Sequence, residues 1–80
     1  MNKDAVGKRI IELCEKENIT VNGLAVKANI PPSTLKNIVY GQVANTGVET
    51  LSKICDGLGI TIQEFFDGEE FKERVYETLN

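Results

Sequence analysis

The sequence contains no histidine, and its two cysteines, Cys14 and Cys55, form no C-x-x-C pair. Protein zinc sites are built largely from these two residue types, and histidine is also the commonest general base. The chain also lacks a glycine-rich phosphate loop, and it shows no nucleophile–base constellation. The sequence therefore predicts no metal site, no cofactor and no enzymatic activity. The two thiols are expected to pack in the core.

Long apolar runs are missing as well. No stretch approaches the length that spans a membrane, and the opening "MNKDAVGKRI" has no signal-peptide core. A cytoplasmic setting is therefore expected. The 80 residues, 41% hydrophobic and 26% charged, suit one small globular domain with a single modest core.

A positive net charge, which nucleic-acid partners would favour, is absent too. The chain carries a net charge of −3. The charge is unevenly distributed, because residues 1–41 hold six basic and four acidic side chains, whereas residues 42–80 hold three and eight. The first half is the half that could face phosphates.

With only two prolines and few β-branched runs, the sequence favours an all-helical fold. Apolar residues at helical spacing predict helices at about 4–17, 21–28, 32–40 and 47–57, with a fifth beginning after Thr61. The first helix should bury Val6, Ile10 and Leu13, flanked by Ile11 and Cys14, and the fourth should bury Val48, Leu51, Ile54 and Cys55. In the second helix, Leu24, Ala25 and Ala28 should face inward.

Capping residues mark where these helices begin. Thr20 and Thr46 are suitable N-caps for the second and fourth helices, and Thr61 with Glu64 matches a capping box. Pro31 and Pro32 stand together before the third helix. Pro32 suits the first helical position, where its missing N–H has no partner in any case.

The ends of the helices are also marked. Asn18 and Asn29 suit the left-handed conformation that follows a helix, and Gly59 should terminate the fourth helix. Ile30 is pushed into extended geometry because it precedes proline. The segment from 21 to 40 therefore predicts two short helices joined by a tight turn, which is a helix-turn-helix arrangement.

This 20-residue block has a small residue, Ala25, at its fifth position, Asn29 at its ninth, and the inward pair Leu35 and Ile38 at its fifteenth and eighteenth. With its flanks "VGKRIIELCEKENIT" and "NTGVETLSKICDGLGITIQEFF", it resembles the Cro/C1-type (XRE-like) helix-turn-helix domain of phage repressors and bacterial regulators. The resemblance covers about residues 4–67. It implies a compact five-helix DNA-binding bundle, usually dimeric, whose third helix enters the major groove.

The expected domain is therefore 1–68, followed by a C-terminal extension at 69–80. The stripe formed by Phe71, Val75 and Leu79 predicts an additional amphipathic helix there. Two roles for that helix stay open: it covers the domain's own core, or it forms a dimer interface.

The resemblance also assigns binding residues. It places four residues on the groove-facing side of the third helix: Pro32, Ser33, Lys36 and Asn37. The chemistry agrees, since asparagine pairs with adenine edges, lysine reaches guanine acceptors or phosphates, and serine serves as donor or acceptor. Phosphate contacts are expected around the start of the second helix and beyond the third: Thr20, Val21, Asn22, Tyr40, Gln42, Asn45 and Thr46.

Three features depart from the family pattern. Val21 stands where a phosphate-holding glutamine is common, and Asn29 stands where glycine is usual. A buried arginine–glutamate pair of many members falls here on Cys14 and Val39, which leaves an apolar contact without the desolvation cost of an ion pair. The third departure concerns the core and leaves the DNA interpretation intact.

Two functions from different classes follow. The leading hypothesis is a sequence-specific, double-stranded DNA-binding transcriptional regulator that acts as a homodimer. The alternative is a protein-interaction module, antitoxin-like or adaptor, that keeps the fold but binds another protein. The acidic second half, together with Val21 and Pro32 in place of polar residues, favours the alternative.

Overall fold

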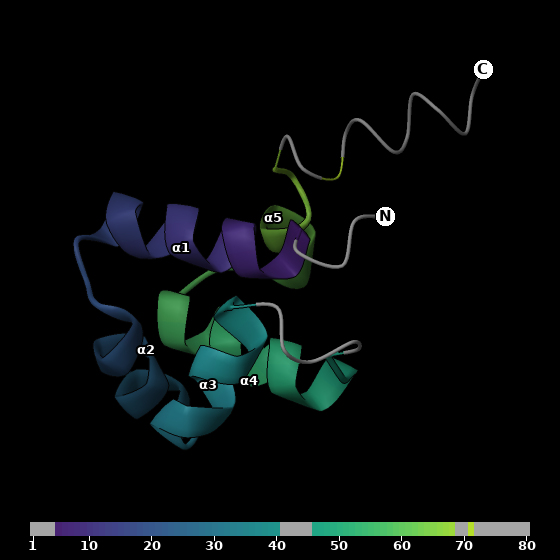
Figure 1. Cartoon of the computed structure of the whole chain (residues 1–80). Coiled ribbons are helices and arrows are strands. Elements are labelled where there is room, and N and C mark those ends of the chain that lie inside the picture. The colour runs from purple at the N-terminus through teal and green to yellow at the C-terminus, as the bar shows by residue number, and fades with distance from the viewer. Residues whose placement is uncertain (1–4, 41–45, 69–70, 72–80) are drawn as a thin grey trace.

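A computed structural model describes residues 5–40, 46–68 and 71. Helices are the regular elements of this described part: α1 (Ala5–Glu17), α2 (Val21–Ala28), α3 (Pro32–Val39), α4 (Val48–Leu58) and α5 (Ile62–Phe65). In Figure 1, α1 lies along one side of the molecule, with α2, α3 and α4 on the other. The predicted all-helical fold is confirmed. No helix within these residues is long and apolar enough to cross a membrane.

The capping residues begin α2 and α5 as predicted. Thr20 accepts a hydrogen bond from the backbone N–H of Gly23 at 2.9 Å. Thr61 accepts one from Glu64 at 3.0 Å, and the Glu64 carboxylate accepts the N–H of Thr61 at 3.1 Å, which completes the capping box. Pro32 occupies the first position of α3.

Three helices end with the same backbone geometry. Asn18 and Asn29 both have φ of 58°, and Gly59 has φ of 72°, so all three adopt the predicted left-handed conformation. The isoleucine that follows each one donates its N–H to the carbonyl five residues earlier at 3.0 Å: Ile19 to Cys14, Ile30 to Ala25 and Ile60 to Cys55. This is the Schellman motif, which pairs carbonyls that the helix leaves unsatisfied.

Two details of the predicted helices are wrong. The N-cap of α4 is Gly47 with no side-chain cap, not Thr46, so the helix begins one residue later than expected. Val48 then occupies the first helical position at the open end of α4 and is 72% exposed rather than buried. In α1, Ile10 and Leu13 are buried as predicted and Ile11, expected on the flank, is 37% exposed, but Val6 is only partly buried because Ala5 and Gly7 complete the buried stripe.

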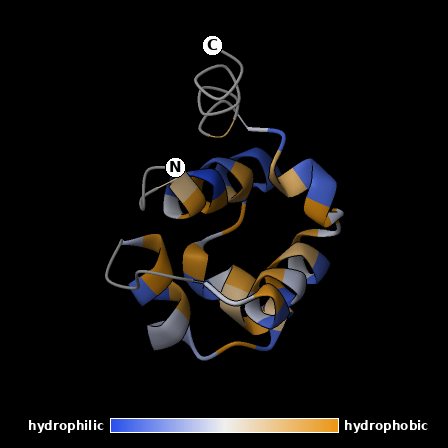
Figure 2. Ribbon diagram, turned by 90° about the vertical axis from the view of Figure 1, so that its right-hand side faces the viewer, coloured by the Kyte–Doolittle hydropathy of each residue, from blue (hydrophilic) through white to orange (hydrophobic). Residues whose placement is uncertain are grey.

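One core unites the helices. Its fully buried side chains come from all five of them: Ile10, Leu24, Leu35, Ile54 and Phe65. Each ribbon in Figure 2 accordingly carries both hydrophobic and hydrophilic segments. Cys14 and Val39, where the family pattern suggested a charged pair, are both buried, and Cys14 and Cys55 are free thiols.

Arg9 fastens α5 to α1. Its Nε donates to the carbonyl of Phe65 at 2.6 Å, and its Nη2 donates to the carbonyl of Glu64 at 2.7 Å. Its Nη1 pairs with the carboxylate of Glu12 on the same helix. A helix of four residues cannot satisfy its own final carbonyls, so the guanidinium acts as its C-terminal cap.

Three phenylalanines pack together at the end of α5 and after it. The ring centroids of Phe66 and Phe71 are 4.8 Å apart at 66°, and those of Phe65 and Phe66 are 5.2 Å apart at 78°. Both are edge-to-face arrangements, which aromatic rings prefer. Phe71 is 8% exposed and therefore covers the domain's own core. Val75 and Leu79, the rest of the predicted stripe, lie outside the described residues.

Candidate nucleic-acid interface

The α3 helix is divided into a buried face and an exposed face. Leu35, Ile38 and Val39 point into the core. All four residues predicted to face the groove are exposed: Pro32, Ser33, Lys36 and Asn37. Helical geometry places Ser33 and Asn37 opposite the buried stripe, with Lys36 on one flank. The exposed face is thus a continuous polar surface.

The polar groups on this face have no side-chain partners among the described residues. No hydrogen bond or ion pair joins Ser33, Lys36 or Asn37 through its side chain to another of the described residues. Their donors and acceptors are therefore available to a ligand. An asparagine carboxamide, a hydroxyl and an ammonium group together match the hydrogen-bonding edges of bases in a major groove.

The beginning of α2 contributes a second group of polar atoms. Thr20 and Asn22 are both exposed. The Thr20 hydroxyl oxygen already accepts from Gly23, so its proton remains available for donation to a phosphate oxygen. Val21 is half-buried and packs against the core. Its side chain therefore contributes to packing, in place of the phosphate-holding glutamine of the family pattern.

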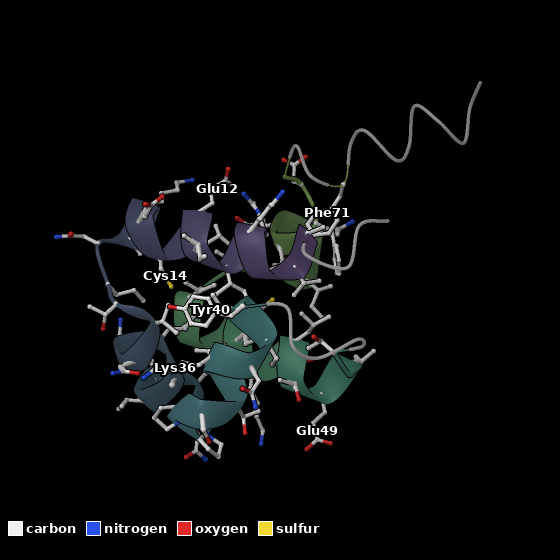
Figure 3. The ribbon with its side chains drawn as sticks, viewed as in Figure 1. Glu12, Cys14, Lys36, Tyr40, Glu49 and Phe71 are labelled. Atoms are coloured by element: carbon white, nitrogen blue, oxygen red, sulfur yellow. The ribbon has the colours of Figure 1, made fainter. Side chains whose placement is uncertain are left out.

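The remaining predicted phosphate contacts follow α3, and the structure describes two of these four residues. Tyr40 follows α3 directly and is 65% exposed. In the view of Figure 3, Tyr40 lies between α1 and the helices below it, whereas Lys36 lies farther from α1. Thr46 is half-buried. Gln42 and Asn45 fall outside the described residues.

The electrostatics of this surface differ from those of the whole chain. Between Glu17 and Glu49 the sequence contains no aspartate or glutamate, and it contains Lys27 and Lys36. Both α2 and α3 lie within this acid-free segment, and both lysines are exposed. The net charge of −3 is therefore carried by other parts of the chain.

Two exposed features were missed at the sequence level. Thr34 is exposed on the opposite flank of α3 from Lys36, which the helical spacing alone could have indicated. Val26 is 76% exposed and borders an open hollow of about 420 Å³ beside the turn between α2 and α3. The hollow is lined by the last turn of α2 and the residues that follow it, so its shape depends on the path of that turn, which residue types alone do not give.

Comparison with known proteins agrees with this geometry. The family model of the Cro/C1-type HTH DNA-binding domain matches residues 9–70. The fold is similar to a crystal structure of a mutant of the restriction-modification controller protein C.Esp1396I, with a TM-score of 0.78 and 24% identity over 90% of this chain and 89% of that chain. The wild-type C.Esp1396I structure gives a TM-score of 0.76 and 22% identity over 90% and 88%. No curated protein matches the sequence significantly.

Proposed function

Because the chain belongs to the Cro/C1-type helix-turn-helix DNA-binding family and is thus a DNA-binding transcriptional regulator, we propose that α3 is its recognition helix and reads duplex DNA in the major groove. The observation that carries this proposal is the polar face of α3, which is exposed, makes no side-chain hydrogen bond to the part of the chain that the structure describes, and is set in an acid-free segment. A helix fits the major groove of B-DNA, where each base pair presents a distinct pattern of donors and acceptors.

Each residue of this face has a role in the proposal. The Asn37 carboxamide pairs with an adenine edge, and Lys36 reaches guanine acceptors or a phosphate. Ser33 is an adaptable donor and acceptor. Pro32 makes only an apolar contact, such as one with a thymine methyl group.

Phosphate contacts orient the domain on the duplex. Six residues supply them in this proposal: Thr20, Asn22, Tyr40, Gln42, Asn45 and Thr46. Contacts of this kind fix register and carry no sequence information by themselves. Thr20 and Asn22 present their polar groups at the N-terminus of α2, where the helix dipole also favours an anion.

The regulator acts as a homodimer in this proposal. One module of this size covers a short half-site, and two modules related by a two-fold axis bind a palindromic site whose halves are about 10 base pairs apart. In this proposal residues 1–68 form the DNA-binding domain, and the helix expected within 69–80 lies, apart from Phe71, outside the described residues. We place the protein in the cytoplasm, where it has access to bacterial DNA.

The test is the double variant Asn37→Ala with Lys36→Ala. Its matched control is Lys53→Ala with Gln63→Ala, which removes one ammonium and one carboxamide group from exposed positions on α4 and α5. Binding sites are first selected from random duplexes at low salt. Circular dichroism then verifies the fold, and gel retardation measures specific and non-specific affinity.

The α3 variant should keep its fold and lose most of its specific affinity, while the control variant binds as the wild type does. Equal specific affinity in both variants would remove the assigned roles. If the wild type retards no specific duplex at micromolar concentration but recovers a stoichiometric protein partner, the protein-interaction alternative replaces this proposal.

A further inference from the structure

The crossing of α1 and α3 is unusually close at Gly7. A Cβ atom placed on Gly7 would lie 2.4 Å from the carbonyl oxygen of Val39, 3.0 Å from its carbonyl carbon and 3.1 Å from the carbonyl oxygen of Ile38. Ordinary carbon–oxygen contacts begin at roughly 3.3 Å. All three neighbours are backbone atoms, so no change of side-chain rotamer can make room, and one helix would have to move by about 1 Å.

Glycine is otherwise a poor choice at this position. Gly7 lies inside α1, where glycine destabilises a helix by about 0.5–1 kcal/mol relative to alanine. Its φ is not in the left-handed region, so the backbone does not require glycine there. The requirement comes from the partner helix.

The atoms that approach Gly7 belong to the last two residues of α3. The opposite end of α3 is fixed by the turn from α2, where the N–H of Ile30 donates to the carbonyl of Ala25 and Pro31 takes the N-cap position of the new helix. Since α3 has only eight residues, displacing one end while the other stays fixed changes its tilt. Binding constellations tolerate errors of only about 0.5 Å.

We propose that Gly7 is a positioning residue for DNA recognition: by lacking a side chain, it lets α1 set the tilt at which α3 presents Ser33, Asn37 and Tyr40. This inference rests on the proposed function, because it requires α3 to enter the groove. Gly7 itself is buried, so it would act through the placement of α3.

The test compares Gly7→Ala with the wild type and with Phe65→Leu. The control lowers stability through the core, but Phe65 lies on α5, whose main packing partner is α4 rather than α3. For each protein, the folded fraction is measured by urea denaturation, and specific and non-specific DNA affinities are corrected to the folded protein. The ratio of these two affinities reports the placement of α3, and a loss of stability alone leaves it unchanged.

We expect the ratio to fall about tenfold or more in Gly7→Ala, which corresponds to the loss of one base contact, and to stay at the wild-type value in Phe65→Leu. An unchanged ratio in Gly7→Ala overturns this inference while leaving the proposed function in place. Absence of specific binding by the wild type overturns both.

A poorly folded variant is handled by a second measurement. If less than half of Gly7→Ala is folded, all three proteins are compared in trimethylamine N-oxide, which favours the compact state without changing the sequence. If Gly7→Ala stays unfolded there, Gly7 is required for the fold as such, and the positioning role is overturned.

Discussion

Arg9 holds three acceptors at once, and these contacts are not equally important. Its side chain is 13% exposed, and two of its donors cap carbonyls at the end of α5, whereas Glu12, its partner in the ion pair, is 49% exposed. Hydrogen bonds from charged groups contribute about 1.5–3 kcal/mol, while exposed ion pairs contribute about 0–1 kcal/mol. The capping of α5 should therefore dominate.

Arg9→Met tests this difference. The substitution keeps most of the aliphatic volume but removes the charged donor from the carbonyls of Glu64 and Phe65, of which the Glu64 carbonyl keeps the backbone N–H of Asp67 at 3.2 Å. The free energy of unfolding should therefore fall by about 1.5–3 kcal/mol. Glu12→Gln should lower it by less than about 1 kcal/mol. Urea denaturation measures both. Equal losses in the two variants would assign the stabilisation to the ion pair instead.

Both thiols are shifted toward the protonated form. Burial raises the pKa of Cys14 above its ordinary value of 9.0, and burial together with the nearby charge of Asp56 raises the pKa of Cys55. A neutral thiol is a poor nucleophile, so both cysteines are suited to packing. This agrees with the core role predicted from the sequence.

The raised pKa values predict a loss of stability in alkaline solution. Above pH 9.0 the unfolded chain releases its thiol protons while the folded protein still holds them. The unfolded state then binds fewer protons, so the free energy of unfolding falls as pH rises through that region. The urea midpoint measured from pH 8 upward should show this decline. In a variant with Cys14→Ala and Cys55→Ala the decline should be smaller, and an identical pH profile would contradict the assignment.

Residues at helix ends and at crossings were the hardest to predict from the sequence. The periodicity of α4 correctly predicts Leu51, Ile54 and Cys55 as buried. It cannot tell whether Val48, the first apolar residue of the helix, packs against the core or projects into solvent. Gly7 carries no local signal, because its role depends on a carbonyl of a distant helix. Such positions are decided by tertiary packing.

At the level of helices, α2 and α5 begin in the same way. Thr20 and Thr61 have identical backbone angles, φ −86° and ψ 164°, and each hydroxyl accepts from the residue three positions ahead. They differ in surroundings, since Thr20 lies in the proposed phosphate-binding region and Thr61 precedes α5. The two threonines therefore form a matched pair.

Thr20→Ala and Thr61→Ala should each lower the free energy of unfolding by about 1 kcal/mol, the usual effect of removing an N-cap. Only Thr20→Ala should also weaken DNA binding by the folded protein, because only its hydroxyl faces a phosphate in the proposal. Urea denaturation and gel retardation give the two measurements. A similar loss of DNA affinity in Thr61→Ala would show that the effect comes from stability.

The limits of most helices can be predicted from the sequence because they depend on a few neighbouring residues, such as caps and prolines. The limits of α2 were predicted as observed, and the start of α3 follows from Pro32. The start of α4 was missed by one residue because Thr46 resembles a cap but makes no capping bond, whereas Gly47 takes the position. A capping residue is recognised by its type, but its use depends on the path of the preceding loop.

For the molecule as a whole, the uneven charge distribution sets the expected strength of DNA binding. The chain has 9 basic and 12 acidic side chains, yet the segment that contains α2 and α3 carries only Lys27 and Lys36. Neutral donors must therefore supply most of the phosphate contacts. Such contacts release few counterions from DNA.

The salt dependence of binding should consequently be shallow. If Lys27 and Lys36 each neutralise one phosphate, the logarithm of the binding constant should fall with the logarithm of salt concentration with a slope of roughly −2 per protomer. Lys36→Ala should reduce the slope by about 1. Titration at several salt concentrations measures it. A slope of twice this size would indicate that basic residues of α1, such as Lys8, also contact phosphates.

The overall arrangement was predictable from the sequence, while the exact placement of its parts was not. The helix-turn-helix block and its flanks identified the fold, because caps, turn residues and apolar spacing agree with one another. The sequence could not give the distance between α1 and α3, the hollow beside Val26 or the capping of α5 by Arg9. The first and the last of these join residues far apart in the chain, whereas the hollow is lined by neighbouring residues and its shape follows from the exact path of the turn.

The backbone hydrogen bonds donated by the isoleucines at positions 19, 30 and 60 each close a turn of six residues at the end of a helix. Closing such small loops takes little time and little entropy, because the ends of each loop are already neighbours. The direction of each following helix is thus set by contacts that are local in sequence. Proteins rich in such local contacts fold faster, as a class, than proteins that depend on pairings between distant segments.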